Sequence, residues 1–150
     1  DVIPYVIAGI MQKIPDITLF LNPCHNSYDR LGGNKAPGYI SWSSENRSQL
    51  IRIPAAEGEY RRAELRSPDS TANPYLAFAA LIYAGLHGIE WELPLPEPAD
   101  VNLHTAPPEV LEQYQKLPTT LASAQCMMVF SEFVQEHFPK ELISAYCSQV

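Results

Sequence analysis

Residues 60–88 decide the fold, and they read YRRAELRSPDSTANPYLAFAALIYAGLHG. Tyr60–Ser67 alternates in character, which predicts a strand. Asn73 and Pro74 then form a helix start, because asparagine caps free backbone N–H groups and proline suits the first helical turn. Pro74–Gly88 carries no charge and has apolar residues on every side, which predicts a buried helix. Strands followed by helices indicate an α+β fold.

Two further strands are expected before this stretch. Gly38–Ser43 and Gln49–Ile53 read as strands, and the short links between them predict that all three strands are antiparallel neighbours. Val2–Ile14 reads as a short apolar helix, and Thr18–Leu21 as a short strand or extended run. Asn22–Pro37 has the turn-forming content of a loop.

The chain after the predicted helix is expected to be extended at first and then helical. Glu90–Pro108 contains five prolines and is interpreted as a linker. Three helical stretches follow, at Pro107–Lys116, Thr119–Met127 and Ser131–Ser148. We therefore expect antiparallel strands packed with a buried helix, followed by a C-terminal helical segment.

Length and composition exclude several classes of protein. The chain has 150 residues, the size of one domain or part of a larger one, and 46% of them are hydrophobic. A net charge of −7 argues against a nucleic-acid partner. The longest uncharged apolar stretch, Tyr75–Leu86, is too short to cross a membrane. Three widely spaced cysteines, with no signal-peptide pattern at the start, predict a cytoplasmic protein.

The basic residues are concentrated in one part of the chain. All six arginines lie between Arg30 and Arg66, whereas residues 67–150 hold ten acids and two lysines. Arginine binds carboxylates and phosphates through two parallel N–H groups. The cluster therefore predicts a site for a small anionic ligand, with a set of surface ion pairs as the alternative.

The sharpest chemical motif is Arg62–Arg66, which reads RAELR. Residues two apart on a strand share a face, so the two arginines would flank Glu64 at about 6.6 Å. This arrangement suits a phosphate with bound Mg²⁺, because the carboxylate is a hard oxygen ligand and the arginines neutralise phosphoryl charge. The alternative is a salt-bridge ladder on a solvated sheet face. Arg52 weakens that alternative, since it lies among aliphatic residues and a buried arginine needs a partner anion.

Five segments resemble, in the same order, motifs of one enzyme family. They are Asn22–Arg30 (N-P-x-x-N-S-Y-x-R), Trp42–Ser48 (W-S-x-x-N-R-S), Ile51–Pro54 (I-R-I-P), Arg62–Asp69 (R-x-E-x-R-x-P-D) and Asn73–Ala80 (N-P-Y-L-A-F-A-A). The family is glutamine synthetase of the bacterial-type class I, in the C-terminal part of its catalytic domain. The resemblance covers essentially all 150 residues. It implies that an N-terminal β-grasp domain and the first part of the catalytic domain are absent from this sequence.

The resemblance implies an ATP-dependent synthesis of glutamine from L-glutamate and ammonia through γ-glutamyl phosphate, assisted by Mg²⁺ or Mn²⁺. The implied roles are metal binding for Glu64, glutamate binding for Arg30, Arg47 and Arg66, ATP binding for Arg47, Arg52 and Arg62, and catalysis for Arg47 and Arg52. The parent enzyme is expected to be a homododecamer, whereas the oligomeric state of these residues alone stays open.

The chain holds only part of the machinery that the resemblance implies. A glycine-rich ATP loop, a metal-binding histidine and further glutamates belong to segments that precede these residues in the family. One carboxylate cannot complete a multi-metal site. We therefore expect the 150 residues to be inactive by themselves.

Two positions depart from the family pattern. In Gly32–Pro37, Lys35 stands where the family carries a glutamate just before Ala-Pro, and that glutamate covers the substrate and helps to deprotonate ammonium. A cation can do neither, unless a gap in this loop shifts the alignment. Two alternatives therefore stay open: a γ-glutamyl ligase for another amine, and a catalytically lapsed homologue that serves as a binding or regulatory module. His104 stands where some members carry an adenylylated tyrosine, so that control is expected to be absent.

Overall fold

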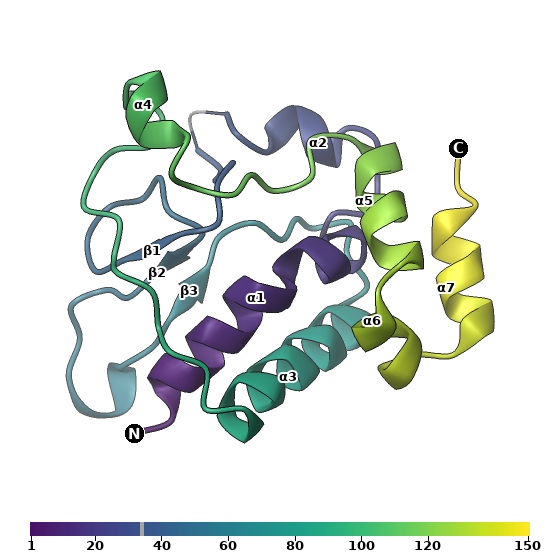
Figure 1. Cartoon of the computed structure of the whole chain (residues 1–150), viewed down its shortest axis with the longest axis horizontal. Coiled ribbons are helices and arrows are strands. Elements are labelled where there is room, and N and C mark those ends of the chain that lie inside the picture. Colours follow the sequence, from purple (N-terminus) through teal and green to yellow (C-terminus); the bar gives the residue numbers. More distant parts are fainter. Residues whose placement is uncertain (34) are drawn as a thin grey trace.

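The computed structural model describes residues 1–33 and 35–150, which form helices and one small sheet at one side of the molecule (Figure 1). The helices are α1 (Ile3–Leu21), α2 (Ser27–Arg30), α3 (Pro74–Glu90), α4 (Pro108–Leu111), α5 (Leu121–Val129), α6 (Glu132–His137) and α7 (Lys140–Cys147), and η1 (Gly58–Tyr60) is a short 3-10 helix. The strands are β1 (Trp42–Ser43), β2 (Ile51–Arg52) and β3 (Glu64–Leu65). The mixture of helices with a small sheet confirms the predicted α+β class.

Helix α1 lies at the centre of the molecule, with the sheet on one side and α3 and the C-terminal helices on the other (Figure 1). The C-terminal half of α1 is largely buried and forms the main core with α3, α5 and α6. The backbones of α1 and α3 touch where Gly9 faces Gly88. A Cβ on Gly9 would collide with the Ala84 carbonyl, and one on Gly88 with the Tyr5 carbonyl. Glycine at both positions therefore permits the close approach.

The three strands form one sheet in the order β1-β2-β3, with β1 and β2 parallel and β2 and β3 antiparallel. The prediction that all three are antiparallel neighbours is therefore wrong for the first pair. The link between β1 and β2 is therefore no hairpin. Within it, the Ser43 hydroxyl accepts hydrogen bonds from the backbone N–H groups of Glu45 and Asn46, at 3.2 Å each. Arg52 and Glu64 are direct register partners across β2 and β3.

The first half of the chain differs from the prediction in the bounds of its elements. The predicted helix Val2–Ile14 and the predicted strand or extended run Thr18–Leu21 are both parts of α1. Thr18–Leu21 is buried in the core, and packing there outweighs local preference. Each strand has only two residues, and Tyr60 belongs to η1 instead of β3. The predicted loop Asn22–Pro37 contains the short helix α2.

Helix α3 confirms the predicted helix, but it is only half buried. Its fully buried positions are small residues, whereas four of its large apolar residues are mostly exposed: the exposed fractions are 84% for Tyr75, 65% for Phe78, 61% for Ile82 and 53% for Leu86. The prediction of a buried helix is therefore wrong. Close contact with α1 requires alanine and glycine on the inner face, which leaves the bulky side chains on the outer face.

The C-terminal part is helical as predicted; α5 is as long as the predicted helix Thr119–Met127 but begins and ends two residues later, and the other two predicted helices are shorter. The stretch Pro107–Lys116 retains only α4, and Ser131–Ser148 is divided into α6 and α7 at Pro139. Proline has no backbone N–H and ends a preceding helix. Among the residues that the structure describes, no helix is long and apolar enough to cross a membrane.

The proline-rich segment after α3 leads from the end of that helix to α4 (Figure 1). The backbone N–H of Ala99 donates to the Trp42 carbonyl at 2.8 Å. The buried Gln49 amide donates to the carbonyls of Ala99, at 2.9 Å, and Val101, at 2.8 Å. The predicted linker is therefore a segment hydrogen-bonded to β1 and to Gln49, two residues before β2 begins.

Candidate functional site

Glu64 on β3 lies between two arginines. Its Oε2 accepts a hydrogen bond from Arg52 Nη1 at 3.0 Å, and its Oε1 accepts from Arg62 Nη2 at 3.0 Å and Nε at 3.3 Å. Burial would raise the pKa of Glu64, but hydrogen bonds and charge from Arg62 and Arg52 outweigh it and lower that pKa below its usual value. Glu64 is therefore a carboxylate at neutral pH, and both of its oxygens are engaged by guanidinium groups.

Arg66 directly follows β3 and lies partly buried near other arginines. Burial lowers the pKa of Arg66, and the charges of Arg47 and Arg52 lower it further. Arg30 adds a weaker effect in the same direction, and Glu64 opposes it. Charges act in this way only over short distances, so arginines from α2, from the β1–β2 link, from β2 and from the end of β3 share one region. Such crowding is unfavourable unless an anion neutralises it.

Several guanidinium groups of this region are free to bind a ligand. Within residues 1–33 and 35–150, the ion pairs of arginine are Arg52–Glu64, Arg62–Glu64 and Arg61–Asp1. Arg30, Arg47 and Arg66 therefore pair with no carboxylate in that part of the chain. The buried Nη1 of Arg66 and Nε of Arg52 also have no hydrogen-bond partner there. Unpaired buried N–H groups are costly, and an anion would satisfy them.

Arg30, at the end of α2, is bound to the chain that follows β3. Its Nη1 donates to the Ser67 carbonyl at 2.7 Å, and its Nη2 donates to the Arg66 carbonyl at 3.1 Å. The planar guanidinium thus bridges two successive carbonyls. This contact brings Arg30 and Arg66 together although they are 36 residues apart in sequence.

Lys35 lies beside the same arginine. Its backbone carbonyl accepts a hydrogen bond from Arg66 Nη2 at 3.4 Å, and the residue itself is exposed. The segment Gly32–Pro37 that carries Lys35 therefore borders the arginine cluster. Asn34 of that segment lies outside the described residues.

The residues present do not complete a metal site. Apart from residue 34, which is not described, the chain has no group of three or more His, Cys, Asp or Glu side chains that could hold a metal ion. Mg²⁺ requires an octahedral set of oxygen ligands, and both oxygens of Glu64 are paired with Arg52 and Arg62. A metal ion on Glu64 would need other ligands from elsewhere and would compete with these two arginines.

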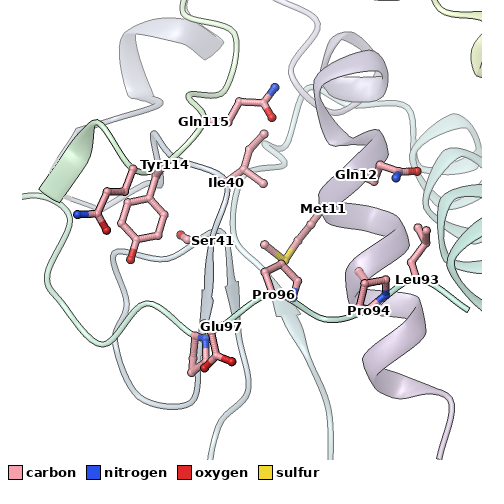
Figure 2. A pocket seen from close by; sticks show the side chains of 13 residues that line it. Met11, Gln12, Ile40, Ser41, Leu93, Pro94, Pro96, Glu97, Tyr114 and Gln115 are labelled. Carbon is pink, nitrogen blue, oxygen red and sulfur yellow. The ribbon is translucent and has the colours of Figure 1, made fainter.

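A separate cavity of about 570 Å³ lies between α1, the proline-rich segment and residues 113–115 (Figure 2). Met11, Ile40 and Pro96 are among its apolar residues, and Glu97 contributes a carboxylate. None of the 13 described residues that line it is an arginine. The arginine cluster is therefore a different region of the molecule.

One family of known proteins matches almost the whole chain. Residues 1–149 match the family described as "Glutamine synthetase, catalytic domain". The chain belongs to the glutamine synthetase family. This membership confirms the family that the motifs predicted, and it assigns the chain to a family of ligases.

Relatives named glutamine synthetase match most of this chain. The protein from Methanosarcina mazei is 46% identical over 145 residues, which are 95% of this chain and 32% of the relative. The protein from Methanocaldococcus jannaschii is 40% identical over 93% of this chain and 32% of its own length. A third, from Staphylococcus aureus, is 43% identical over 86% of this chain and 30% of its own length. The chain thus spans about a third of the length of these glutamine synthetases.

The motifs include Asn22 without giving it a role and leave Ser67 unspecified, although both lie at the edge of the arginine cluster. Asn22 Nδ2 donates to the Ser67 carbonyl at 2.8 Å, and the same carbonyl accepts from Arg30. The contact is made by a backbone atom, which has no signature in the sequence. The available signal was Asn22-Pro23, because an asparagine before a proline at the end of a helix marks a fixed turn.

Proposed function

We propose that this chain forms the arginine-rich part of the substrate site of a glutamine synthetase. The enzyme would convert L-glutamate, ATP and ammonia to glutamine, ADP and phosphate through γ-glutamyl phosphate. The main support is that Arg30 is hydrogen-bonded to the backbone of Arg66 and Arg52 is paired with Glu64, while Arg66 Nη1 and Arg52 Nε have no hydrogen-bond partner among the described residues. γ-Glutamyl phosphate carries a carboxylate and a phosphoryl group, the two kinds of anion that arginine binds through paired N–H groups.

The proposed roles divide the cluster between the two substrates. Arg30 and Arg66 would bind the carboxylate of glutamate, because Arg30 is fixed against Arg66 and both lack a carboxylate partner among residues 1–33 and 35–150. Arg52 and Arg62, on the side of Glu64, would bind the phosphates of ATP. Arg47 is exposed and acts electrostatically on Arg66, so it would contact both glutamate and the transferred group. Arg47 and Arg52 would then stabilise the negative charge that develops on the transferred phosphoryl group.

The metal proposal is limited by the residues present. Glu64 would contribute one oxygen ligand to Mg²⁺ or Mn²⁺, and the remaining ligands would come from outside this chain. We therefore derive the roles above from the arginines alone. We further propose that these 150 residues are the C-terminal part of the catalytic domain of a cytoplasmic homododecamer and that they are inactive alone.

Lys35 favours a second candidate function. It borders Arg66 and adds a cation where ammonium would have to enter. A ligase that uses another amine, or a homologue that binds anions without catalysis, would tolerate this charge. Ammonium would be repelled.

A chimeric enzyme tests both candidates. The matching segment of the Methanosarcina mazei glutamine synthetase would be replaced by residues 1–149 of this chain, and glutamine formation would be measured with Lys35 and with Lys35→Glu. Activity with Lys35 supports the first proposal. Activity only with Lys35→Glu supports the lapsed homologue, and activity with other amines supports the alternative ligase. A folded, correctly assembled chimera that is inactive in every case would contradict the proposed synthetase.

A further inference from the structure

We infer that Asn22 is a positioning residue that holds Arg30 in the orientation in which Arg30 and Arg66 bind an anion. The inference rests on the proposed function of the arginine cluster, and it goes beyond it by naming the residue that orders the cluster. Asn22 carries no charge and lies outside the set of arginines. It would act through a backbone carbonyl.

Asn22 is rigidly placed at the end of α1. Its backbone N–H donates to the Thr18 carbonyl at 2.8 Å, and none of the residue is exposed to solvent. Its side-chain Nδ2 donates to the Ser67 carbonyl at 2.8 Å across a sequence separation of 45 residues. The buried Oδ1 of the same amide has no hydrogen-bond partner among the described residues, so the side chain is held through Nδ2.

The Ser67 carbonyl connects Asn22 to Arg30. It accepts from Asn22 Nδ2 at 2.8 Å and from Arg30 Nη1 at 2.7 Å, so both of its lone pairs are used. The other donor of the same guanidinium reaches the Arg66 carbonyl at 3.1 Å. The two carbonyls must therefore keep their relative orientation for Arg30 to bridge them. A long arginine side chain that is ordered before a ligand binds loses less entropy on binding.

Asp69 determines which way the Asn22 amide points. Asp69 Oδ2 lies 3.5 Å from Asn22 Nδ2, and the backbone N–H of Asp69 donates to the Leu21 carbonyl at 3.2 Å. Burial would raise the pKa of Asp69, but hydrogen bonds from Ser27, Thr71 and Asn22 lower it, so Asp69 is ionised and can only accept. A flipped amide would place its oxygen against two acceptors. Nδ2 therefore faces Ser67 and Asp69.

Arginine-detected NMR of the 150-residue chain tests the inference. A guanidinium whose Nη atoms are held by different carbonyls rotates slowly and gives separate Nη signals, whereas a free one gives averaged signals. Arg30→Lys assigns these signals. We expect separate Arg30 signals in the wild type, averaged signals in Asn22→Asp, and a dissociation constant for inorganic phosphate about tenfold higher in that variant. Asn22→Asp preserves the shape of the side chain but removes the donor.

Asn26→Asp is the matched control, because Asn26 is exposed in the same loop and its side chain makes no capping hydrogen bond. It adds the same charge and should leave the Arg30 signals separate. Averaged Arg30 signals in the wild type would overturn the inference, even if Asn22→Asp does not fold. Separate signals in folded Asn22→Asp, or averaged signals with unchanged phosphate affinity, would overturn it as well. A wild type that binds no phosphate contradicts the proposed function, while its Arg30 signals still decide the positioning role.

Discussion

Arg52 Nη1 on β2 lies 3.0 Å from Glu64 Oε2 on β3, and the two residues are direct register partners in the sheet. The backbone pairing and the ion pair therefore place the same two residues together. Arg62 occupies the other oxygen of Glu64. Glu64 thus partly neutralises the cluster and determines how much positive charge an incoming anion meets.

Glu64→Gln should strengthen the binding of inorganic phosphate several-fold in the absence of divalent metal. The substitution removes a negative charge beside the guanidinium donors and frees Arg52 and Arg62. Calorimetric titration with a chelator present measures the effect. Glu59→Gln is the control, because Glu59 is exposed on η1 and makes no ion pair among the residues described. Unchanged or weaker binding by Glu64→Gln would show that Glu64 does not control the charge of the cluster.

Asp69 should make the fold sensitive to acid. Its pKa in the folded chain lies below the ordinary value of 3.8, because the hydrogen bonds it accepts outweigh the effect of burial. A lowered folded-state pKa adds stability above the unfolded pKa, and this stability is lost as the pH falls through the folded value. Asp69→Asn should therefore destabilise the chain by about 1 kcal/mol at neutral pH and by less below about pH 4. Urea unfolding of both proteins from pH 7 to pH 3 measures this. If the difference in the free energy of unfolding between the two proteins did not change with pH, the lowered pKa would not belong to Asp69.

Gly88→Ala should lower the free energy of unfolding by about 2–3 kcal/mol, although alanine favours helix more than glycine does. The new Cβ would collide with the Tyr5 carbonyl, and backbone cannot move as easily as a side chain. Gly85→Ala is the control on the same helix, since its Cβ would meet Val6 Cγ1 at 3.0 Å, a side-chain atom. We expect that variant to stay within about 1 kcal/mol of the wild type. Equal losses in chemical denaturation would argue against the close contact of α1 and α3.

The exposed apolar face of α3 should cause self-association that polar substitutions on this face relieve. Phe78→Gln combined with Ile82→Lys should reduce the binding of a hydrophobic dye and concentration-dependent association, because large exposed apolar patches promote both. Stability should change by less than about 0.5 kcal/mol. Ala77→Gln, on the buried face of the same helix, should instead destabilise the chain. Unfolding of the double variant would show that this face is packed.

Local signals in the sequence predicted α3 well. Asn73 Oδ1 accepts from the backbone N–H groups of Tyr75, at 2.9 Å, and Leu76, at 3.3 Å, as expected for an N-cap before proline. Which face of α3 is covered could not be predicted, because every face is apolar. The other differences depend on contacts between distant parts of the chain: Thr18–Leu21 is buried and continues α1, and β1 pairs with β2 in parallel.

For the candidate site, the sequence predicted that arginines from separate segments lie close together, but not how they are held. Arginine clustering indicated an anion site, and the structure places Arg30 against Arg66 and Arg52 against Glu64. Their roles toward substrates stay proposals. The contacts of Arg30 go to backbone carbonyls, which every residue has, so no pattern of side chains could reveal them.

Titration of the chain with inorganic phosphate, comparing Arg66→Gln with Arg61→Gln, tests the anion site most directly. Arg66 has a buried N–H group without a partner in the described structure, whereas Arg61 is exposed and pairs with Asp1 at 3.6 Å. Both variants lose one positive charge. We predict that Arg66→Gln raises the dissociation constant about tenfold or more and that Arg61→Gln changes it by less than about twofold. Equal effects of the two substitutions, or no phosphate binding by the wild type, would contradict the account.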